Sequence, residues 1–181
     1  TQVDVEVIPN FSFLPAQVSV KDNCETISVI FARRFYEYRG TRIFSNAIKR
    51  ILSEYHNVHV TIAGEGPDGG FLHNYFDDNE CVFFTKYNSA DSLCIHADKH
   101  IAVVPTLGSE GTSLSLLEAM ASQCAVICTN VGGMTNIVID HYNGLMIKPT
   151  ADSLYMALSE LITNSTMRVK LASNAHETVK D

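Results

Sequence analysis

The chain has 181 residues, 46% of them hydrophobic, and a formal net charge of −7 at pH 7. A chain of this length and composition is expected to form one globular domain, large enough to bury a core without disulfides. The net charge argues against general nucleic-acid binding, which needs clustered lysine and arginine. None of the apolar runs approaches the roughly 18 residues that a membrane-spanning helix needs.

Cysteine usage indicates a reducing compartment. The five cysteines are Cys24, Cys81, Cys94, Cys124 and Cys128. They form no C-x-x-C pair and mostly lie in apolar runs, as expected of reduced thiols packed as small hydrophobes. No basic segment with an apolar continuation follows Thr1, so a secretory leader is not predicted. We therefore expect a cytoplasmic protein, and the sequence leaves association with the inner face of a membrane open.

Six apolar runs of strand length recur along the chain. They are β-branched and lack an alternation of apolar and polar residues, which is typical of parallel strands covered on both faces. The predicted strands are residues 26–32, 58–63, 81–84, 100–105, 124–129 and 144–149.

Helices are predicted between several of these strands. Residues 40–56 carry an apolar stripe at helical spacing, a second helix is predicted over 113–122, and the tail from Ala151 onward contains two more. Alternating strands and helices predict an α/β fold, a doubly wound parallel sheet forming one Rossmann-like domain. Residues 26–181 form this domain, and residues 1–25 are expected to be a lead-in or interdomain linker.

Polar loops follow the predicted strands at one edge of the sheet. Ligands of open α/β sheets bind beyond the carboxyl ends of the strands. The loops at these ends read RRFYEYRG, GEGPDGG, TKYN, TLGSEGTS and NVGG. Glycine, hydroxyl and basic residues together favour a ligand that carries phosphate, although any one such loop would be unremarkable.

The second of these loops resembles a dinucleotide-binding fingerprint. Gly64, Gly66 and Gly69 have the spacing G-x-G-x-x-G. The fingerprint needs the first strand before it, a full helix after it and an acidic residue at the end of the next strand. Here the loop follows the second strand, and Thr85 and Lys86 stand where the acid should be. A tight turn at the ligand edge is therefore favoured over an NAD site.

The fourth loop and the helix after it carry two acidic residues eight positions apart, Glu110 and Glu118. Between them, Gly111, Thr112 and Ser113 lead into the helix, whose first N–H groups and dipole suit a phosphate or diphosphate. The alternative for Glu118 is structural, because S-x-x-E from residue 115 also reads as a helix capping box. No structural pattern accounts for Glu110.

The stretch EGTSLSLLEAMA…AVICTNVGGMTNIVIDHYNGLMIKP resembles the donor-domain signature of the retaining GT-B glycosyltransferases of family 4, the glycosyl transferases group 1, with its E-x7-E element. FARRFYEYRGTRIFSNAIKRI resembles that family's first strand and loop, in which Lys-Gly follows an arginine by five residues. VHVTIAGEGP resembles its second strand and turn, and VIPN its interdomain segment. The resemblance covers residues 7 to about 176 and is most specific over 108–149.

The resemblance implies a role for each matching residue. Glu118 would hold the ribose of a nucleotide-sugar donor, and Glu110 the hydroxyls of the transferred sugar. Arg34 and Arg39 would neutralise the diphosphate, so that Glu110, Arg34 and Arg39 form the catalytic set. The remaining donor-binding residues would act mainly through their backbone. They are Gly111, Thr112, Ser113 and Leu114 at the sugar and diphosphate, Gly64 at the turn, and Thr85, Lys86 and Tyr87 at the base.

The sequence departs from the family pattern in three ways. Arg39 replaces the family's lysine and brings a planar fork in place of a point charge. Arg33 stands where the family has glycine, which leaves open whether Arg33 or Arg34 faces the ligand, since neighbours at a strand end point to opposite faces. The family's N-terminal acceptor domain has no counterpart before Thr1. We expect a donor-binding half that binds nucleotide but is inactive alone.

Two classes of function therefore remain for comparison. The first is the donor domain of a hexosyltransferase, serving cell-surface polysaccharide or lipopolysaccharide synthesis, with no metal or other cofactor. The second is a non-catalytic nucleotide-binding module, with an NAD-dependent enzyme as a weaker alternative. The histidine pairs His56/His59 and His96/His100 have ligand-like spacings but no third partner, so surface or capping roles are favoured.

Overall fold

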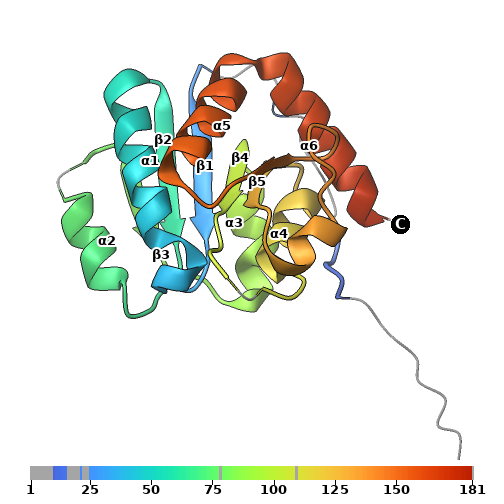
Figure 1. The fold of residues 1–181 in the computed structure, drawn as a ribbon, viewed down its shortest axis with the longest axis horizontal. Helices are drawn as coiled ribbons and strands as arrows, with labels where there is room; N and C mark the ends of the chain where they lie inside the picture. The colour runs from blue at the N-terminus through green and yellow to red at the C-terminus, as the bar shows by residue number, and fades with distance from the viewer. Residues whose placement is uncertain (1–9, 16–20, 22–24, 78, 109, 181) are drawn as a thin grey trace, which may run out of the picture.

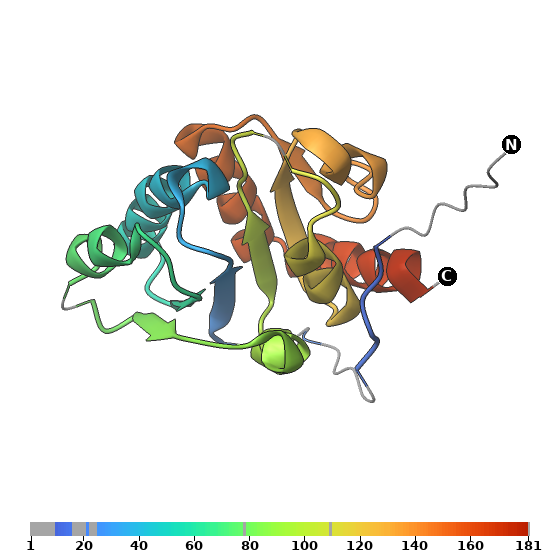
Figure 2. The same cartoon turned by 90° about the horizontal axis from the view of Figure 1, so that it is seen from below.

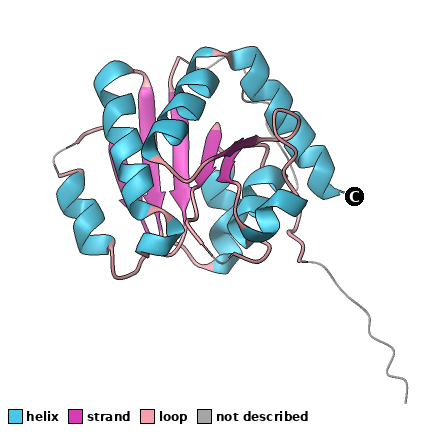
Figure 3. Cartoon of the chain, in the orientation of Figure 1, coloured by secondary structure: helices cyan, strands magenta, loops and turns pink. Residues whose placement is uncertain are grey.

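The computed structural model describes residues 10–15, 21, 25–77, 79–108 and 110–180. These residues form a six-stranded sheet in which every pair of neighbouring strands is parallel, with helices on both faces (Figure 1, Figure 3). The strands are β1 (Ile27–Ala32), β2 (Val58–Ala63), β3 (Val82–Thr85), β4 (Ile101–Val104), β5 (Ala125–Thr129) and β6 (Leu145–Ile147). The predicted fold is confirmed, and all six predicted strands are present.

The strands lie in the order β3-β2-β1-β4-β5-β6. This is the doubly wound order, in which the chain builds outward from β1 in one direction and then from β4 in the other. β1 and β4 are neighbours, with Val29 opposite Ile101. The loops that leave these two strands therefore diverge at the switch point, where a crevice opens. Strand β5 is buried along its whole length, whereas β3 at the edge alternates between half-buried and exposed residues.

The described residues contain six α-helices, of which four connect strands and two follow β6. They are α1 (Thr41–Glu54), α2 (Gly69–Tyr75), α3 (Ser92–His96), α4 (Leu114–Ala121), α5 (Ala151–Thr163) and α6 (Ser165–Lys180). The helices predicted from apolar stripes correspond to α1, α4, α5 and α6. Helices α2 and α3 were not predicted because both are short. Helix α2 has seven residues and buries one of them, and α3 has five residues and buries two.

Two apolar layers hold the helices on the sheet. On one face, Phe44 and Ile48 of α1 and Leu158 of α5 are fully buried against β1 and its neighbours, and the Phe44 ring lies 4.6 Å from that of Phe31. Burying each such side chain contributes about 1.5 to 3 kcal/mol. On the other face, α4 inserts Leu116, with further apolar residues of the same helix. Figure 2 shows α1 and α3 on opposite sides of the strands.

The lead-in segment contacts the domain through several of its described residues, and the Glu25 carbonyl accepts a hydrogen bond from the Asn57 side chain at 3.1 Å. The ammonium group of Lys21 donates hydrogen bonds to the backbone carbonyls of Lys99 (2.6 Å), Ser122 (2.8 Å) and His96 (3.1 Å). The Asn10 side chain donates to the carbonyl of Thr112 at 3.3 Å. Most of the predicted linker over residues 1–25 lies outside the described residues. The part that is described is attached to the domain.

Candidate functional site

A cleft of about 660 Å³ lies at the carboxyl ends of β1 and β4, at the switch point of the sheet. We call it the main cleft. Its walls come from the loop after β1, the turn after β2, the loop after β3, and the loop and first turn of α4 after β4. The lining residues are Asn10, Ala32, Arg33, Arg34, Arg39, Gly64, Glu65, Tyr87, Ser89, Glu110, Thr112, Ser113, Leu114, Ser115 and Glu118.

The two arginines that follow β1 point to different surroundings. Arg33 continues the pairing of β1 with β2, since its backbone N–H donates to the carbonyl of Ala63 at 3.0 Å. Arg33 is buried, with 6% of its surface exposed. Arg34 is exposed at the mouth of the cleft. The sequence left open which of the two arginines faces the ligand, and in the structure both line the cleft. Arg33 forms the floor and Arg34 the rim.

A glycine directly after β2 lets this strand end lie close to Arg33. Gly64 has φ +137°, and a Cβ there would lie 2.0 Å from the Arg33 carbonyl oxygen. Only glycine fits this position, both for its dihedral and for the space. Gly64 therefore acts as a backbone spacer on the wall of the main cleft, as predicted for a tight turn and not for a dinucleotide fingerprint, which would follow β1.

The Glu110 carboxylate is the centre of the main cleft. Its Oε2 lies 2.5 Å from Nη2 of Arg33 and accepts a hydrogen bond from Oγ1 of Thr106 at 3.0 Å. Arg39 also donates to this oxygen, and the second arm of the Arg33 fork donates to Thr106. We call these four residues the Glu110 cluster. The sequence pattern placed Glu110 and Arg39 in the site but missed Thr106 and the inward direction of Arg33.

Backbone contacts fix the position of Glu110. The N–H of Gly133 donates to the Glu110 carbonyl at 3.0 Å. Its neighbour Gly132 has φ +59°, and a Cβ there would lie 2.1 Å from the same carbonyl oxygen. The loop after β5 is thus packed directly onto the loop after β4. Thr129, at the end of β5, adds a hydrogen bond from its hydroxyl to the Thr106 carbonyl at 2.6 Å.

The charges of the Glu110 cluster reinforce one another. Burial alone would favour the neutral form of Glu110, but the hydrogen bond from Arg39 and the charge of Arg33 outweigh burial and hold the pKa of Glu110 below its usual value. Burial lowers the pKa of Arg33, and the nearby Glu110 carboxylate counters this shift. The cluster therefore carries one carboxylate and two guanidinium groups, an excess of positive charge suited to an anionic ligand.

Glu118 has a different environment from Glu110. It lies in the middle of α4, half-buried, and burial raises the pKa of its carboxyl. Tyr87 lies near it, and burial followed by the charge of Glu118 raises the pKa of Tyr87 to about 12. The alternative interpretation of residues 115–118 as a capping box is wrong, because α4 has Ser113 at its N-cap and Ser115 lies inside the helix. The Ser113 side chain makes no capping hydrogen bond. Glu118 therefore faces the main cleft without a helix-capping duty.

The start of α4 presents small polar residues to the cleft. Ser113 takes an extended backbone conformation at the N-cap, and its hydroxyl lies 3.1 Å from that of Ser115. Thr112 and Leu114 line the cleft on either side of it. The Ser113 side chain makes no capping hydrogen bond, and the first residues of α4 line the cleft, so the N-terminal N–H groups of this helix are available there to a negatively charged group.

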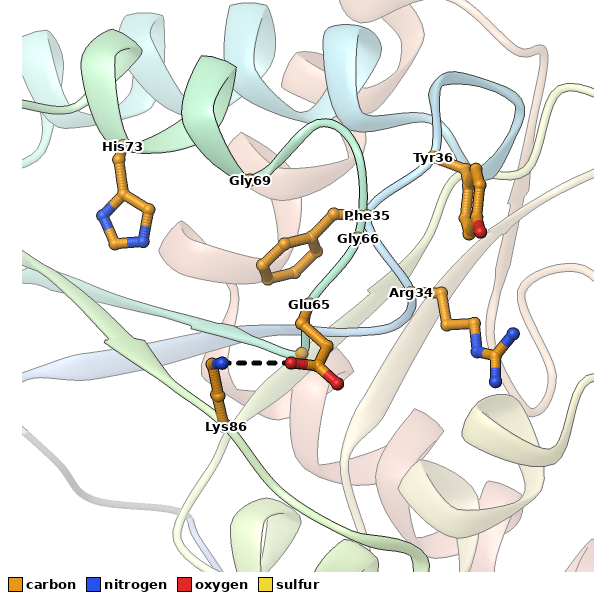
Figure 4. Close-up of a pocket in the computed structure, with 9 residues that line it drawn as sticks. Arg34, Phe35, Tyr36, Glu65, Gly66, Gly69, His73 and Lys86 are labelled. Atoms are coloured by element: carbon orange, nitrogen blue, oxygen red, sulfur yellow. Dashed lines mark ion pairs between the residues drawn. The ribbon is translucent and has the colours of Figure 1, made fainter.

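A second pocket of about 580 Å³ adjoins the main cleft (Figure 4). We call it the side pocket. It shares Arg34, Gly64 and Glu65 with the main cleft and is otherwise lined by Phe35, Tyr36, Gly66, Gly69, His73 and Lys86. Lys86 pairs with Glu65 at 3.0 Å on its rim, as the dashed line in Figure 4 marks. The His73 ring stacks on Phe84, with centroids 3.9 Å apart.

The structure gathers most of the predicted site residues in one place. Of the predicted set, Arg34, Arg39, Glu110, Glu118, Thr112, Ser113, Leu114, Gly64 and Tyr87 line the main cleft. Lys86 lines the side pocket, and Gly111 and Thr85 lie outside both linings. Asn10 and Ser89 line the main cleft without having been predicted. Asn10 belongs to the VIPN segment, which was the available signal for it.

The histidine pairs do not converge on a site. His56 and His59 are exposed, whereas His96 and His100 are buried and bond to backbone groups of Ser92 and Ser28. Burial lowers the pKa of both buried histidines to about 4. Among the residues that the structure describes, no three histidine, cysteine or acidic side chains are grouped to hold a metal ion. No helix in the described ranges is both long and apolar enough to span a membrane.

The fold and the main cleft define the class of the molecule. It is a Rossmann-like α/β domain with a cleft of arginines and carboxylates at its topological switch point. The chain belongs to the family of glycosyl transferases group 1, whose model matches residues 26–164. It has the fold of the C-terminal domain of a GT-B glycosyltransferase.

Known proteins support this assignment. An uncharacterized glycosyltransferase of Methanocaldococcus jannaschii is 30% identical over 151 residues, which cover 82% of this chain and 42% of that protein. The phosphatidyl-myo-inositol mannosyltransferase of Mycolicibacterium smegmatis is 23% identical over 155 residues, 84% of this chain and 40% of that enzyme. The chain thus spans about two fifths of the length of these curated relatives.

Solved structures show the same fold. The C-terminal domain of the glycosyl transferase group 1 family protein LpcC from Francisella tularensis superposes with a TM-score of 0.79 at 28% identity, covering 93% of this chain and 94% of that one. HepE from Anabaena, solved in complex with UDP-glucose, superposes with a TM-score of 0.77 at 19% identity, over 86% of this chain and 44% of that one.

Proposed function

We propose that this chain is the nucleotide-sugar-binding domain of a glycosyltransferase that transfers the sugar with retention. The observation that carries the proposal is the main cleft, which gathers three arginines with the carboxylates of Glu110 and Glu118 at the switch point of the sheet. The relatives support it, since HepE was solved with UDP-glucose and shares this fold. The main cleft, at about 660 Å³, has room for a ligand of nucleotide-sugar size.

The chemistry of the cleft suits departure of a nucleoside diphosphate. Breaking the bond between sugar and diphosphate builds negative charge on the leaving phosphate. Arg34 and Arg39 would stabilise that charge together with the N-terminus of α4, without a metal ion. Each such contact contributes on the order of 2 to 4 kcal/mol to lowering the barrier.

The two carboxylates would hold the two hydroxyl-bearing parts of the donor. Glu118, in the helix and without an arginine partner in the cluster, would accept hydrogen bonds from the ribose. Glu110 would accept them from the transferred sugar. The base would lie against the segment Thr85–Tyr87, with Gly111 and its neighbours contacting the sugar through their backbone.

The complete reaction would need more than this chain. Because the chain spans about two fifths of its curated relatives, we propose that an N-terminal domain supplies the acceptor site and that the 181-residue chain alone binds donor without turnover. A role in cell-surface polysaccharide or lipopolysaccharide synthesis, at the inner face of the membrane, is part of the same proposal.

A binding screen tests the donor assignment. The 181-residue chain is titrated calorimetrically with UDP, GDP, ADP, a sugar conjugate of each, and NAD. We expect one nucleoside diphosphate to bind, with binding lost in Glu118→Ala and weakened in Arg39→Ala. Glu160→Ala and Arg50→Ala are matched controls, since both side chains lie outside the main cleft. Binding of NAD alone, or equal effects of site and control variants, would reject the proposal.

A further inference from the structure

The two arginines of the Glu110 cluster differ in how firmly they are held. Arg33 and Arg39 contact the same oxygen of Glu110, but the Arg33 side chain is 4% exposed and that of Arg39 is 25% exposed. The two terminal nitrogens of the Arg33 guanidinium donate hydrogen bonds to two different partners, Nη1 to Thr106 and Nη2 to Glu110. Among the described residues, the Arg39 guanidinium contacts the Glu110 carboxylate and Tyr38, whose ring centre lies 5.1 Å from its guanidinium carbon.

The partners of Arg33 are themselves fixed. Thr106 is fully buried, and its carbonyl accepts the hydroxyl of Thr129 at 2.6 Å. The Glu110 backbone is held by Gly133 through its carbonyl. Arg33 thus belongs to a frame that joins the ends of β1, β4 and β5. Arg39 ends a short helical turn, η1 (Glu37–Arg39), which buries no residue. Of the two arginines, Arg39 is the one that can exchange partners.

We infer that Arg33 is a positioning residue, which holds the Glu110 carboxylate in place while Arg39 leaves it for the diphosphate of the donor. This inference rests on the proposed function. The Glu110 side chain is buried, with 8% of it exposed. Without Arg33, the departure of Arg39 would leave this carboxylate with the Thr106 hydroxyl and no positive partner in the cluster, and removing one partner of a buried pair is strongly destabilising. With Arg33 in place, Glu110 keeps a guanidinium partner and its orientation in the cleft. Arg33 therefore assists phosphate binding without touching the phosphate.

A double-mutant cycle distinguishes this indirect role from direct contact. The nucleoside diphosphate selected by the binding screen is titrated into the wild-type chain, Arg33→Met, Glu110→Gln, and the double variant. We expect Arg33→Met to weaken binding about tenfold or more in the wild-type background. In the Glu110→Gln background the same change should have no effect, because no carboxylate is left to compensate. Arg50→Met, outside the cleft, is the matched control.

Each other result counts against the inference. Equal weakening in both backgrounds would mean that Arg33 contacts the phosphate or merely supports the fold, and no weakening in either would mean that Glu110 needs no second arginine. If Arg33→Met does not fold, Arg33→Gln replaces it, with a smaller weakening that again vanishes beside Glu110→Gln. Absence of binding by the wild-type chain to every nucleotide would reject the proposed function itself, and the inference with it.

Discussion

Replacing Glu110 by glutamine is expected to tighten nucleoside diphosphate binding, although Glu110 is the central acidic residue of the site. In the wild-type chain, a phosphate must draw Arg39 away from this carboxylate. Hydrogen bonds to charged groups contribute about 1.5 to 3 kcal/mol when buried. Because the Arg39 side chain is a quarter exposed, solvent screening reduces this to about 1 kcal/mol. Glu110→Gln should therefore bind the diphosphate roughly fivefold more tightly.

The same substitution should weaken the fold. Arg33 would keep Thr106 and an amide oxygen but lose its counter-charge, at a cost of about 3 to 5 kcal/mol in the free energy of unfolding. Affinity is measured by calorimetry with the diphosphate and with its sugar conjugate, and stability by urea unfolding. The sugar conjugate should gain less affinity than the diphosphate, since Glu110→Gln alters the contact proposed for the sugar hydroxyls.

Glu118→Gln is the matched control for this experiment, because Glu118 lines the same cleft but is not paired with Arg33 or Arg39. It should weaken binding of the diphosphate and its sugar conjugate alike. If Glu110→Gln weakened diphosphate binding as much as Glu118→Gln does, the assumed competition between Glu110 and phosphate for Arg39 would be wrong.

Two further outcomes concern stability. The pKa of Glu110 is lowered in the folded chain, so its ion pairs contribute stability that is present above the unfolded value of about 4.3 and lost as the pH falls through the folded pKa. In urea titrations at a series of pH values, Glu110→Gln should therefore flatten the loss of stability below about pH 4.3. Glu118→Gln removes a carboxyl of raised pKa, which takes up a proton in the folded chain above about pH 4.3, so this variant should lose stability more steeply than the wild type as the pH falls toward that value. Gly132→Ala should lower the free energy of unfolding by at least about 1 to 3 kcal/mol, because a Cβ would meet the Glu110 carbonyl. Gly108→Ala, with open space around it, should stay within about 0.5 kcal/mol, and equal urea midpoints for the two variants would contradict the geometry.

The sequence predicted the sheet well because its central strands β1, β4 and β5 are buried almost throughout and therefore read as continuous apolar runs. The helices α2 and α3 escaped prediction because each is short and buries too little to show a stripe. Their positions depend on packing between distant segments, which no local pattern records.

Site residues could be predicted where they belong to a motif of fixed spacing. They could not be predicted where their role depends on the direction in which the side chain points. Glu110 and Glu118 stand out by their separation, whereas Thr106 is a single threonine after a strand. Alternation along β1 shows that Arg33 and Arg34 point apart. Which of them points inward is decided by the loop after β4, which places Thr106 beside the Arg33 guanidinium.

The glycine contacts at the site divide its positions into those that tolerate replacement and those that do not. Gly64 packs against the backbone carbonyl of Arg33, and Gly132 packs against that of Glu110. Close backbone packing therefore fixes the position of both residues of the central ion pair. Gly108 and Gly111, on the loop after β4, meet nothing within 4 Å of an added Cβ. Side chains can therefore be introduced at Gly108 and Gly111 without a clash, whereas a Cβ at Gly64 or Gly132 would displace the backbone around the charged centre.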